Sequence, residues 1–386
     1  MKRREFLSMA AAAGASLSMS RVFAAPHPGG GITSQLDARA TARGGLGKLL
    51  ILIELKGGND GLNMVVPFTD STYYALRRHI AIPRDQVLAL DAGTALHPAL
   101  RPLLSVWRDG QLAVVQGVGC DQDSAAHFRS SEIWDTGSRA DVYRRDGWLA
   151  RAAGQCAARK RSFATASFGS MEQGPFGQSA SCNESAWTGV DDPDAAARVG
   201  HVDVDAGERD PVSSTMFDAA HADTLTFRGS IDAALRTVDT MQPHACGAIR
   251  VTLDGFDTHG NQMARQADLL AQLADGCATL RAELMRRRRW RDTLVMTYSE
   301  FGRSARENAY RGTEHGGAAA QFVMGGEVRG GVFGQPPDLT RLDADGKLPV
   351  EIDFRRLYAT VLASFWKLDA NAVLHDVVNP LPLLRA

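Results

Sequence analysis

An aspartate and a histidine two residues apart, Asp257 and His259, lie in the segment Gly255-Phe-Asp-Thr-His-Gly-Asn-Gln262. The segment follows a short apolar run, 248–253, that predicts a buried strand, and it precedes a long helical pattern from about residue 263. We therefore expect both side chains on a strand-to-helix loop, where an open α/β sheet places its functional groups. A carboxylate and an imidazole at this spacing can bind one metal ion.

Metal-ligand residue types recur in three further loops beside predicted strands. Asp60 follows the first apolar run, Glu300 follows a later one, and His315 lies just before the last. Carboxylates with imidazoles suit zinc, manganese or iron better than a soft-ligand metal. Two ions about 3.5–4 Å apart, with about six to eight protein ligands, could hold a phosphoryl or sulfuryl group. We expect a divalent metal site, with zinc as the first expectation and manganese or iron as alternatives.

Each of these residues also has a plain structural interpretation. The glycine-rich loop around Asp60 is typical of a tight turn. Glu300 could pair with Arg303 or Arg306. Arg303 could stabilise the charge that develops on a substrate oxygen, or it could form an ion pair with Glu300 or Glu307. The recurrence at four strand ends is what favours a functional site.

The nucleophile is the weakest part of the pattern. The loop after the second apolar run carries Ser124 and His127, and Ser124 is the nearest hydroxyl. A serine on a polar loop is more often structural, and a metal-bound water could attack instead. No G-x-S-x-G segment is present, which argues against a Ser-His-Asp hydrolase. No stretch fits a Walker or dinucleotide-binding glycine pattern.

The elements that must position these residues alternate between strands and helices. Near-continuous apolar runs predict buried strands, and amphipathic stretches at about 98–107, 263–289 and 354–366 predict helices. The alternation predicts an α/β fold, a doubly wound mostly parallel sheet with helices on both faces. Residues 155–230 break the pattern, and we interpret them as an irregular insertion that partly forms a lid. The runs that predict strands are 49–55, 112–118, 248–253, 294–297 and 321–324.

The N-terminus has the features of a targeting segment. Arg3 and Arg4 precede a weakly hydrophobic run, and small residues end it near Ala25. This pattern predicts a twin-arginine signal peptide over residues 1–25 and a periplasmic protein. The run is too short to anchor the chain across a bilayer. A flexible linker at 26–46 and a single domain at 48–386 complete the predicted organisation.

Composition narrows the classes of partner and of cysteine chemistry. The 386 residues carry a net charge of −1, which gives no bulk field for nucleic acid or an anionic membrane. Five widely spaced cysteines include no C-x-x-C pair, so a cysteine zinc site is not expected. An oxidising compartment would allow one or two disulfides, and the odd count leaves at least one thiol unpaired.

Four segments carry a resemblance to a known family. They are Leu52-Ile-Glu-Leu-Lys-Gly-Gly-Asn-Asp-Gly-Leu-Asn-Met-Val-Val-Pro67, Gly255-Phe-Asp-Thr-His259, Tyr298-Ser-Glu-Phe-Gly-Arg303 and Gly312-Thr-Glu-His-Gly316. From about residue 48 onward the chain resembles the twin-arginine-exported bacterial family catalogued as domain of unknown function 1501. That family is similar to the alkaline phosphatase and sulfatase superfamily. Its members use a doubly wound sheet with two metals at the strand ends and a Ser or Thr nucleophile.

The resemblance implies a set of metal ligands. Asp60 matches the first-strand aspartate of one metal, and Asp257 with His259 match ligands of the other. Glu300 stands where the superfamily has the aspartate of an Asp-His pair, and His315 matches a late histidine before a final strand.

The chain also departs from that pattern. Phe301 stands in place of the paired histidine, so one ligand is missing, and His127 could replace it from another loop. Phe256 and Glu314 stand where relatives usually have Trp and Asp, and Ala126 replaces the serine before His127.

Two functions of different classes follow. The first is an exported metal-dependent hydrolase of phosphate or sulfate esters, acting on a small-molecule or polymer substrate. The alternative is a non-catalytic periplasmic binding or assembly protein on the same scaffold, which would bind an exported protein partner or a polysaccharide. The missing histidine and the uncertain nucleophile favour the alternative, and the joint ligand pattern favours the hydrolase.

Overall fold

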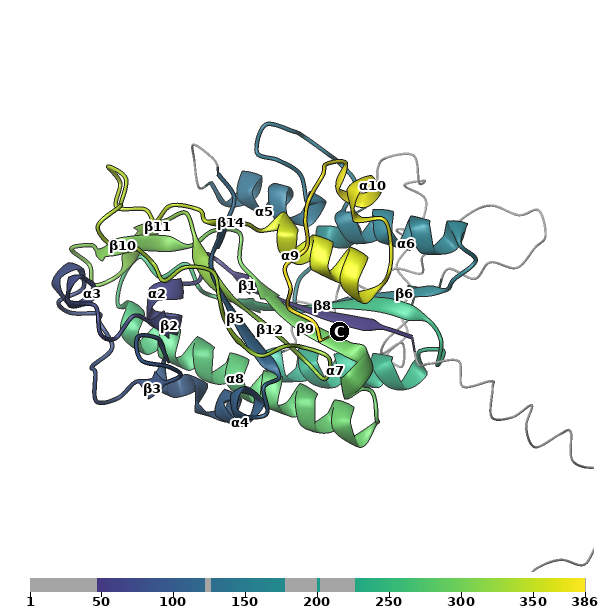
Figure 1. Ribbon diagram of the computed structural model, residues 1–386, viewed down its shortest axis with the longest axis horizontal. Coiled ribbons are helices and arrows are strands. Elements are labelled where there is room, and N and C mark those ends of the chain that lie inside the picture. The colour runs from purple at the N-terminus through teal and green to yellow at the C-terminus, as the bar shows by residue number, and fades with distance from the viewer. Residues whose placement is uncertain (1–46, 122–125, 178–199, 202–225, 386) are drawn as a thin grey trace, which may run out of the picture. The chain divides into compact units, whose positions relative to one another are not determined.

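The computed structural model describes residues 47–121, 126–177, 200–201 and 226–385. Within them a nine-stranded sheet runs in the order β13-β5-β12-β9-β1-β8-β6-β7, and β14 pairs with β5 (Figure 1). Its strands are β1 (Leu49–Lys56), β5 (Leu112–Gly119), β6 (Phe163–Phe168), β7 (Gly200–His201), β8 (Cys246–Asp254), β9 (Thr293–Tyr298), β12 (Ala319–Gly325), β13 (Gly331–Phe333) and β14 (Ile352–Asp353).

The sheet is mostly parallel. β1 pairs in parallel with both β8 and β9, and β8 pairs in parallel with β6. β12 is antiparallel to β9 and to β5, and β7 is antiparallel to β6. β1, β5, β6, β8 and β9 therefore share one direction, and their carboxyl ends meet at one edge. This arrangement confirms the predicted fold class.

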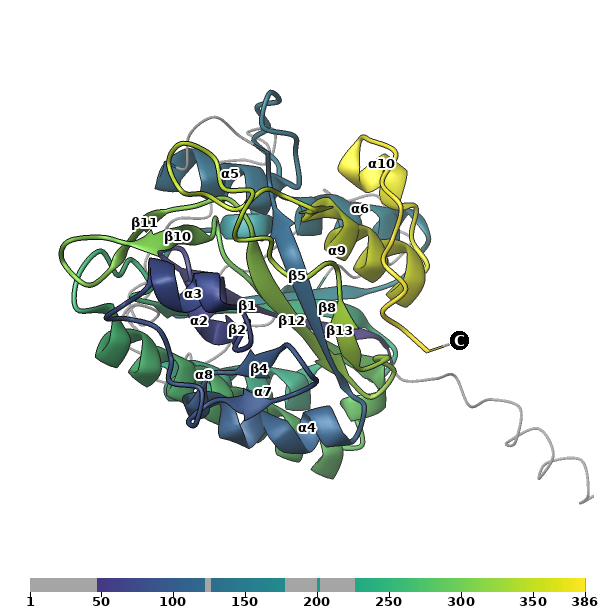
Figure 2. The same cartoon turned by 60° about the vertical axis from the view of Figure 1, so that its left-hand side comes forward.

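Helices cover both faces of the sheet (Figures 1 and 2). One face packs against α4 (Leu104–Arg108), α7 (Phe227–Thr240) and α8 (Gln262–Arg286). The other packs against α5 (His127–Thr136), α6 (Trp148–Ala158), α9 (Arg355–Ala359) and α10 (Ala370–Leu374). A π-helical turn, Thr360–Phe365, continues α9.

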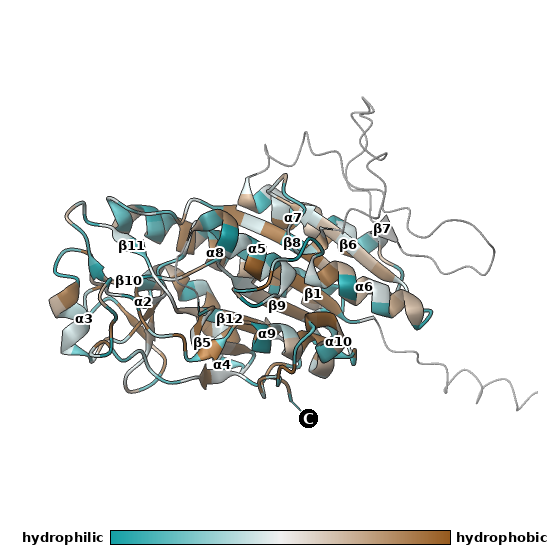
Figure 3. Cartoon of the chain, turned by 90° about the horizontal axis from the view of Figure 1, so that it is seen from above, coloured by the Kyte–Doolittle hydropathy of each residue, from teal (hydrophilic) through white to brown (hydrophobic). Residues whose placement is uncertain are grey.

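Side chains of β1 show why the central strands are apolar throughout. Leu49, Ile51 and Ile53 belong to the cluster on one face, whereas Leu50 and Leu52 belong to the cluster on the other. All five are fully buried. A strand that is covered on both sides needs apolar residues at every position rather than at alternate ones. Figure 3 shows the same strands as hydrophobic bands between more polar helices.

Shorter elements lie near the carboxyl edge of the sheet. β2 (Val65–Val66), β4 (Ala95–Leu96) and β3 (Leu88–Ala89) form a three-stranded sheet. β10 (Arg303–Glu307) and β11 (Thr313–His315) form an antiparallel hairpin. The remaining elements are α2 (Gly61–Met64), α3 (Ser71–Leu76) and three 3-10 turns at Pro98–Leu103, Gly174–Phe176 and Trp290–Asp292.

Parts of the structure differ from the sequence-based expectations. Residues 163–168, inside the insertion expected at 155–230, form β6 of the main sheet. The end of α6 and the beginning of α7 also lie inside that expected insertion. The run Phe-Ala-Thr-Ala-Ser-Phe is small and weakly apolar, so it does not resemble a buried strand in sequence. The helix expected at 98–107 begins as a 3-10 turn at Pro98 and becomes α-helical only at Leu104.

The predicted signal peptide and the predicted linker lie outside the described residues, as does most of 178–225. Within the described part, none of the helices combines the length and the apolar composition needed to cross a membrane. The four described cysteines are free thiols, and Cys182 lies outside the described part. No disulfide therefore forms among Cys120, Cys156, Cys246 and Cys277 in this structure.

Candidate metal centre

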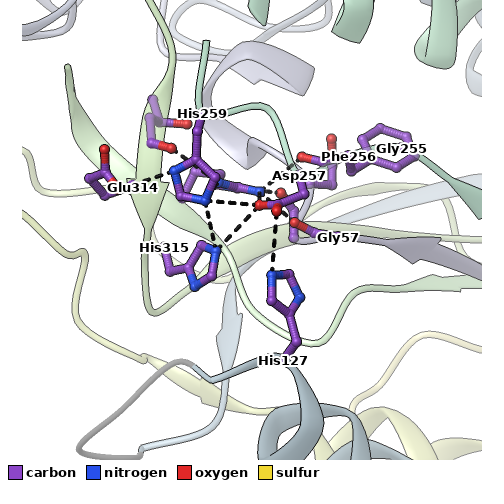
Figure 4. Close-up of polar contacts among 12 residues, drawn as sticks. Gly57, His127, Gly255, Phe256, Asp257, His259, Glu314 and His315 are labelled. Carbon is purple, nitrogen blue, oxygen red and sulfur yellow. Dashed lines mark hydrogen bonds and ion pairs between the residues drawn. The ribbon is translucent and has the colours of Figure 1, made fainter. Parts of the chain in front are cut away.

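Three imidazoles surround the carboxylate of Asp257 (Figure 4). Its Oδ1 lies 3.0 Å from His259 Nε2 and 3.3 Å from His315 Nε2. Its Oδ2 lies 3.6 Å from His127 Nε2. His259 Nε2 and His315 Nε2 are themselves 3.0 Å apart. The structure thus brings together four of the residues predicted from the sequence.

The carboxyl ends of neighbouring strands place these side chains. Asp257 and His259 follow β8, and the loop after β1 lies directly against them. Gly57 in that loop has a φ of +111°, and a Cβ there would lie 2.4 Å from the backbone nitrogen of Asp257. Only glycine adopts this conformation without strain and permits this approach.

His315 reaches the cluster from the hairpin. It ends β11 and pairs with Arg303 at the start of β10. The ring of Phe301 stacks on the ring of His315, with centroids 4.3 Å apart. A flat apolar contact of this kind fixes the ring plane without occupying a ring nitrogen.

His127 is the first residue of α5. α5 lies on the face of the sheet opposite to α8, the helix that follows the loop of Asp257 and His259. Nδ1 of His127 lies 3.0 Å from Glu300 Oε1, and the His127 ring lies 4.9 Å from that of Phe301. His127 therefore lies beside Phe301, the residue that stands where the sequence resemblance implied a histidine.

Glu300 takes a different part from the predicted one. It is 3% exposed, and its Oε1 accepts hydrogen bonds from the backbone nitrogen of Gly57 and from His127 Nδ1. It orients an imidazole rather than lying among the cluster's donor atoms. It pairs with neither Arg303 nor Arg306 in the described structure.

Arg303 is fully buried and makes hydrogen bonds to the backbone of several loops. Its guanidinium donates to the carbonyl oxygens of Gly57, Gly58, Phe256 and Thr313. It also donates to Asp257 Oδ1 at 2.6 Å. These bonds hold three loops together and engage the donor nitrogens that a substrate oxyanion would need. Its carboxylate partner is Asp257, not Glu300 or Glu307.

Asp60 has its own set of partners. It is 1% exposed, and its Oδ1 caps α2 by accepting from the backbone nitrogen of Leu62. Its Oδ2 accepts from Arg77 Nη1 at 2.5 Å and from Gln262 Nε2. Both oxygens are engaged by protein donors, so the structure does not bring Asp60 into the cluster. Ser124, the candidate nucleophile, lies outside the described residues.

Glu314 is a site residue for which the sequence showed only a departure from the family pattern. Its Oε2 lies 3.0 Å from His259 Nδ1. The signal that could have identified it is its place next to His315 in the sequence, in the same short strand.

The charges around the cluster are unbalanced. Asp257, Glu300 and Glu314 supply three carboxylates against the one guanidinium of Arg303, a formal charge of −2 when the imidazoles are neutral. The hydrogen bond to Glu300 raises the pKa of His127, against the opposing effect of partial burial. Burial alone would raise the pKa of Asp257, but the hydrogen bond and charge of Arg303, with His259 and His315, lower it. The surroundings therefore favour a cation.

The donor atoms have the spacing of a metal site. Zinc binds nitrogen and oxygen at about 2.0–2.2 Å, which places neighbouring donors of a tetrahedral site about 3.3–3.6 Å apart. Four separations among these donor atoms run from 3.0 to 3.6 Å. Donor atoms of His127, Asp257 and His315 all lie within 4.8 Å of one another, and His259 does not belong to that group although its Nε2 lies 3.0 Å from both Asp257 Oδ1 and His315 Nε2.

Comparisons with known proteins identify a family and distant structural similarities. Residues 218–378 match the model of the family "Protein of unknown function (DUF1501)". The comparison with curated protein sequences found no match.

Similar solved structures include the zinc complex of the C-terminal periplasmic domain of EcEptC from Escherichia coli. It is 10% identical, with a TM-score of 0.43 and coverage of 88% of each chain. The PsFucS1 sulfatase from Pseudoalteromonas sp. is 11% identical with a TM-score of 0.39, over 91% of this chain and 74% of the other. An alkaline phosphatase superfamily protein from Vibrio parahaemolyticus is 12% identical with a TM-score of 0.36, over 79% and 68%. At these identities and TM-scores, the metals and substrates of those proteins are not assigned to this chain.

Proposed function

We propose that the chain, whose residues 218–378 match the DUF1501 family model, binds one divalent metal ion and uses it to hydrolyse a phosphate or sulfate ester. The ion would be held by His127, Asp257, His259 and His315, with zinc expected first and manganese or iron as alternatives. The protein would act after export, through the twin-arginine pathway, on a small-molecule or polymer ester.

One observation carries the metal part of this proposal. The Nδ1 atoms of His127 and His259 each face a glutamate oxygen at 3.0 Å. A carboxylate only accepts, so each Nδ1 that faces a glutamate carries a proton. A ring that is otherwise neutral then turns an Nε2 lone pair toward Asp257, and a metal ion between them would relieve the repulsion, whereas a ring protonated at both nitrogens would donate to Asp257 instead. A divalent ion there would also neutralise the formal charge of −2.

A bound ion would supply a Lewis acid and lower the pKa of a coordinated water. The protein's own residues would do the rest. Glu300 and Glu314 orient two imidazoles, and Arg303 holds the loops after β1 and β8 in register. Ser124 stays the candidate side-chain nucleophile, with water as the alternative. Support for ester hydrolysis, as distinct from metal binding, comes from the family resemblance and from the position at the carboxyl edge of the sheet.

A second function has one specific observation in its favour. Every donor group of Arg303 is engaged within the protein, so this arginine presents no free charge to an anionic substrate. Four protein ligands are also typical of closed, structural zinc sites, whereas catalytic sites keep a position open. A non-catalytic binding or assembly protein with a metal-fixed loop cluster is therefore the alternative.

Metal analysis of the purified protein tests the proposed metal site. We expect about one equivalent of metal in the wild type and its loss in the His259→Ala/His315→Ala double variant. His79→Ala is the matched control, because His79 pairs with Glu307 away from the cluster. No metal in the wild type, even after reconstitution with zinc, manganese or iron, would overturn the hydrolase and leave the non-catalytic binding protein. Metal without turnover across a panel of phosphate and sulfate esters would select the binding protein.

A further inference from the structure

His259 is held on its outer side by a small network from the β10–β11 hairpin. Its Nδ1 lies 3.0 Å from Glu314 Oε2 (Figure 4). The other oxygen of Glu314 accepts from Asn308 Nδ2 at 2.7 Å. The same Asn308 amide donates to the backbone oxygen of His259 at 2.9 Å. Asn308, Glu314 and His259 thus form a closed ring of hydrogen bonds around the imidazole.

The hairpin that carries Glu314 is fixed against the loop of His259. Backbone nitrogens of Asn261 and Gln262 donate to the oxygens of Tyr310 and Arg311. A Cβ at Gly312 would lie 2.3 Å from the carbonyl carbon of His259, so the approach requires glycine. Asn308 Oδ1 accepts from the nitrogens of Tyr310 and Gly312, which shapes the turn between the two strands. Glu314 therefore has a defined place rather than that of a free surface side chain.

We propose that Glu314 is a positioning residue, which fixes the tautomer and the ring orientation of His259, and that Asn308 holds Glu314 in place. Glu314 accepts the Nδ1 proton, and this keeps Nε2 of His259 facing Asp257 and His315. Partners of this kind commonly set the affinity of a metal site through the ligand that they orient. The proposal rests on the proposed metal site for its functional meaning, but the tautomer that it assigns exists without the metal.

The competing interpretation is an ordinary surface ion pair. The side chain of Glu314 is 62% exposed, and exposed ion pairs contribute little to stability. An ion pair of that kind would leave the tautomer of His259 and the metal affinity unchanged when its charge is removed. Glu307 offers the matched control, because it lies on the same hairpin and contacts Nδ1 of His79, a histidine outside the cluster.

The test compares Glu314→Gln with Glu307→Gln in two measurements. In the metal-free protein at fixed pH, imidazole ¹⁵N NMR should show a protonated Nδ1 on His259 in the wild type and in Glu307→Gln, and a mixture of tautomers in Glu314→Gln. In a competition titration, Glu314→Gln should bind zinc about 10-fold more weakly. Glu314→Asp keeps the carboxylate and should recover part of that loss.

The outcomes separate this inference from the proposed function. An unchanged His259 tautomer in Glu314→Gln would overturn the positioning role, whatever the metal does. Where the wild type binds zinc, an affinity of Glu314→Gln equal to that of Glu307→Gln would overturn it as well. A wild type that binds no metal but shows the assigned tautomer would refute the metal site and leave the role of Glu314 standing.

Discussion

Asp60 and Asp257 look alike in the sequence and differ in the structure. Each follows a central parallel strand and lies in a loop that contains glycine. Asp60 is 1% exposed, and its oxygens are taken by a backbone amide, a guanidinium and a side-chain amide. The side chain of Asp257 is 46% exposed, and it faces three imidazoles. The partners of a carboxylate, rather than its place after a strand, separate a structural residue from a candidate metal ligand.

The difference has a physical origin in the donors that surround each group. Protein N–H donors satisfy the lone pairs of Asp60, so a metal would have to displace Arg77 and Gln262. Asp257 has one donor of this kind, Arg303, and otherwise faces ring nitrogens whose lone pairs suit a cation. Substitutions of four aspartates, Asp60, Asp135, Asp257 and Asp70, test this comparison through measurements of stability and metal binding.

Asp60→Asn should have the largest effect on stability. It removes the charge partner of Arg77, which is fully buried, and breaking a buried ion pair costs about 3–5 kcal/mol. Urea unfolding of the metal-free protein measures the loss. An additional Arg77→Met substitution removes the uncompensated charge and should restore part of the stability. A variant that folds like the wild type but loses its metal would return Asp60 to the ligand set.

Asp135→Asn should change the pH dependence of stability. Asp135 lies on α5, and its Oδ1 is shielded from solvent without a hydrogen-bond partner among the described residues. Burial raises the pKa of Asp135 to about 8, against the opposing charge of Arg250.

The sign follows from the direction of that pKa. The folded state holds a proton that the unfolded state releases near pH 3.9, so wild-type stability falls as pH rises from about 4 to about 8. The loss is at most about 1.4 kcal/mol for each pH unit in that window. Asp135→Asn cannot ionise and should lose less stability between pH 5 and pH 8 in urea unfolding. Parallel pH profiles for the variant and the wild type would refute the assignment.

Asp257→Asn should cost less stability than Asp60→Asn but should abolish metal binding. It removes one charged hydrogen bond of Arg303, a loss of about 1.5–3 kcal/mol at most, and the four carbonyl acceptors of Arg303 remain. Unfolding with and without a chelator separates the two effects. The wild type should lose stability when chelator is added, whereas the variant should not respond. A chelator response that survives in Asp257→Asn would place the metal elsewhere.

The same contrast explains what could be predicted from the sequence. Fully apolar runs predicted the strands that are buried on both faces, because no other element needs such runs at that length. Carboxyl ends of parallel strands share an edge, which is why the proximity of Asp257, His259 and His127 was predictable. His315 precedes β12 and reaches the same edge because β12 is antiparallel to its neighbours, which the sequence did not indicate. The segment at β6 was missed because its alanines and serines pack tightly without a strong apolar signal.

Partner identities were not predictable in the same way. Asp60 meets Arg77 only because α3 folds back over the loop after β1, and nothing in the segment 73–90 marks that arginine. Glu300 follows its strand as expected, yet His127 arrives at its oxygen from the other face of the sheet. Spacing along the chain places a side chain at the edge, while tertiary packing decides which donor reaches it.

Asp70→Ala should have the smallest effect in the series. Asp70 is the N-cap of α3 and accepts one hydrogen bond, from the backbone nitrogen of Thr72 at 2.7 Å. Loss of such a cap costs about 1 kcal/mol. Arg77 is the C-cap of α3, so the N-cap also helps to fix the position of the guanidinium that holds Asp60. If the cap serves α3 alone, its cost should add to that of Asp60→Asn in the double variant. A cost in the double variant well below the sum would show that Asp70 stabilises the chain by positioning Arg77, and the structural role of Asp60 would then extend through α3.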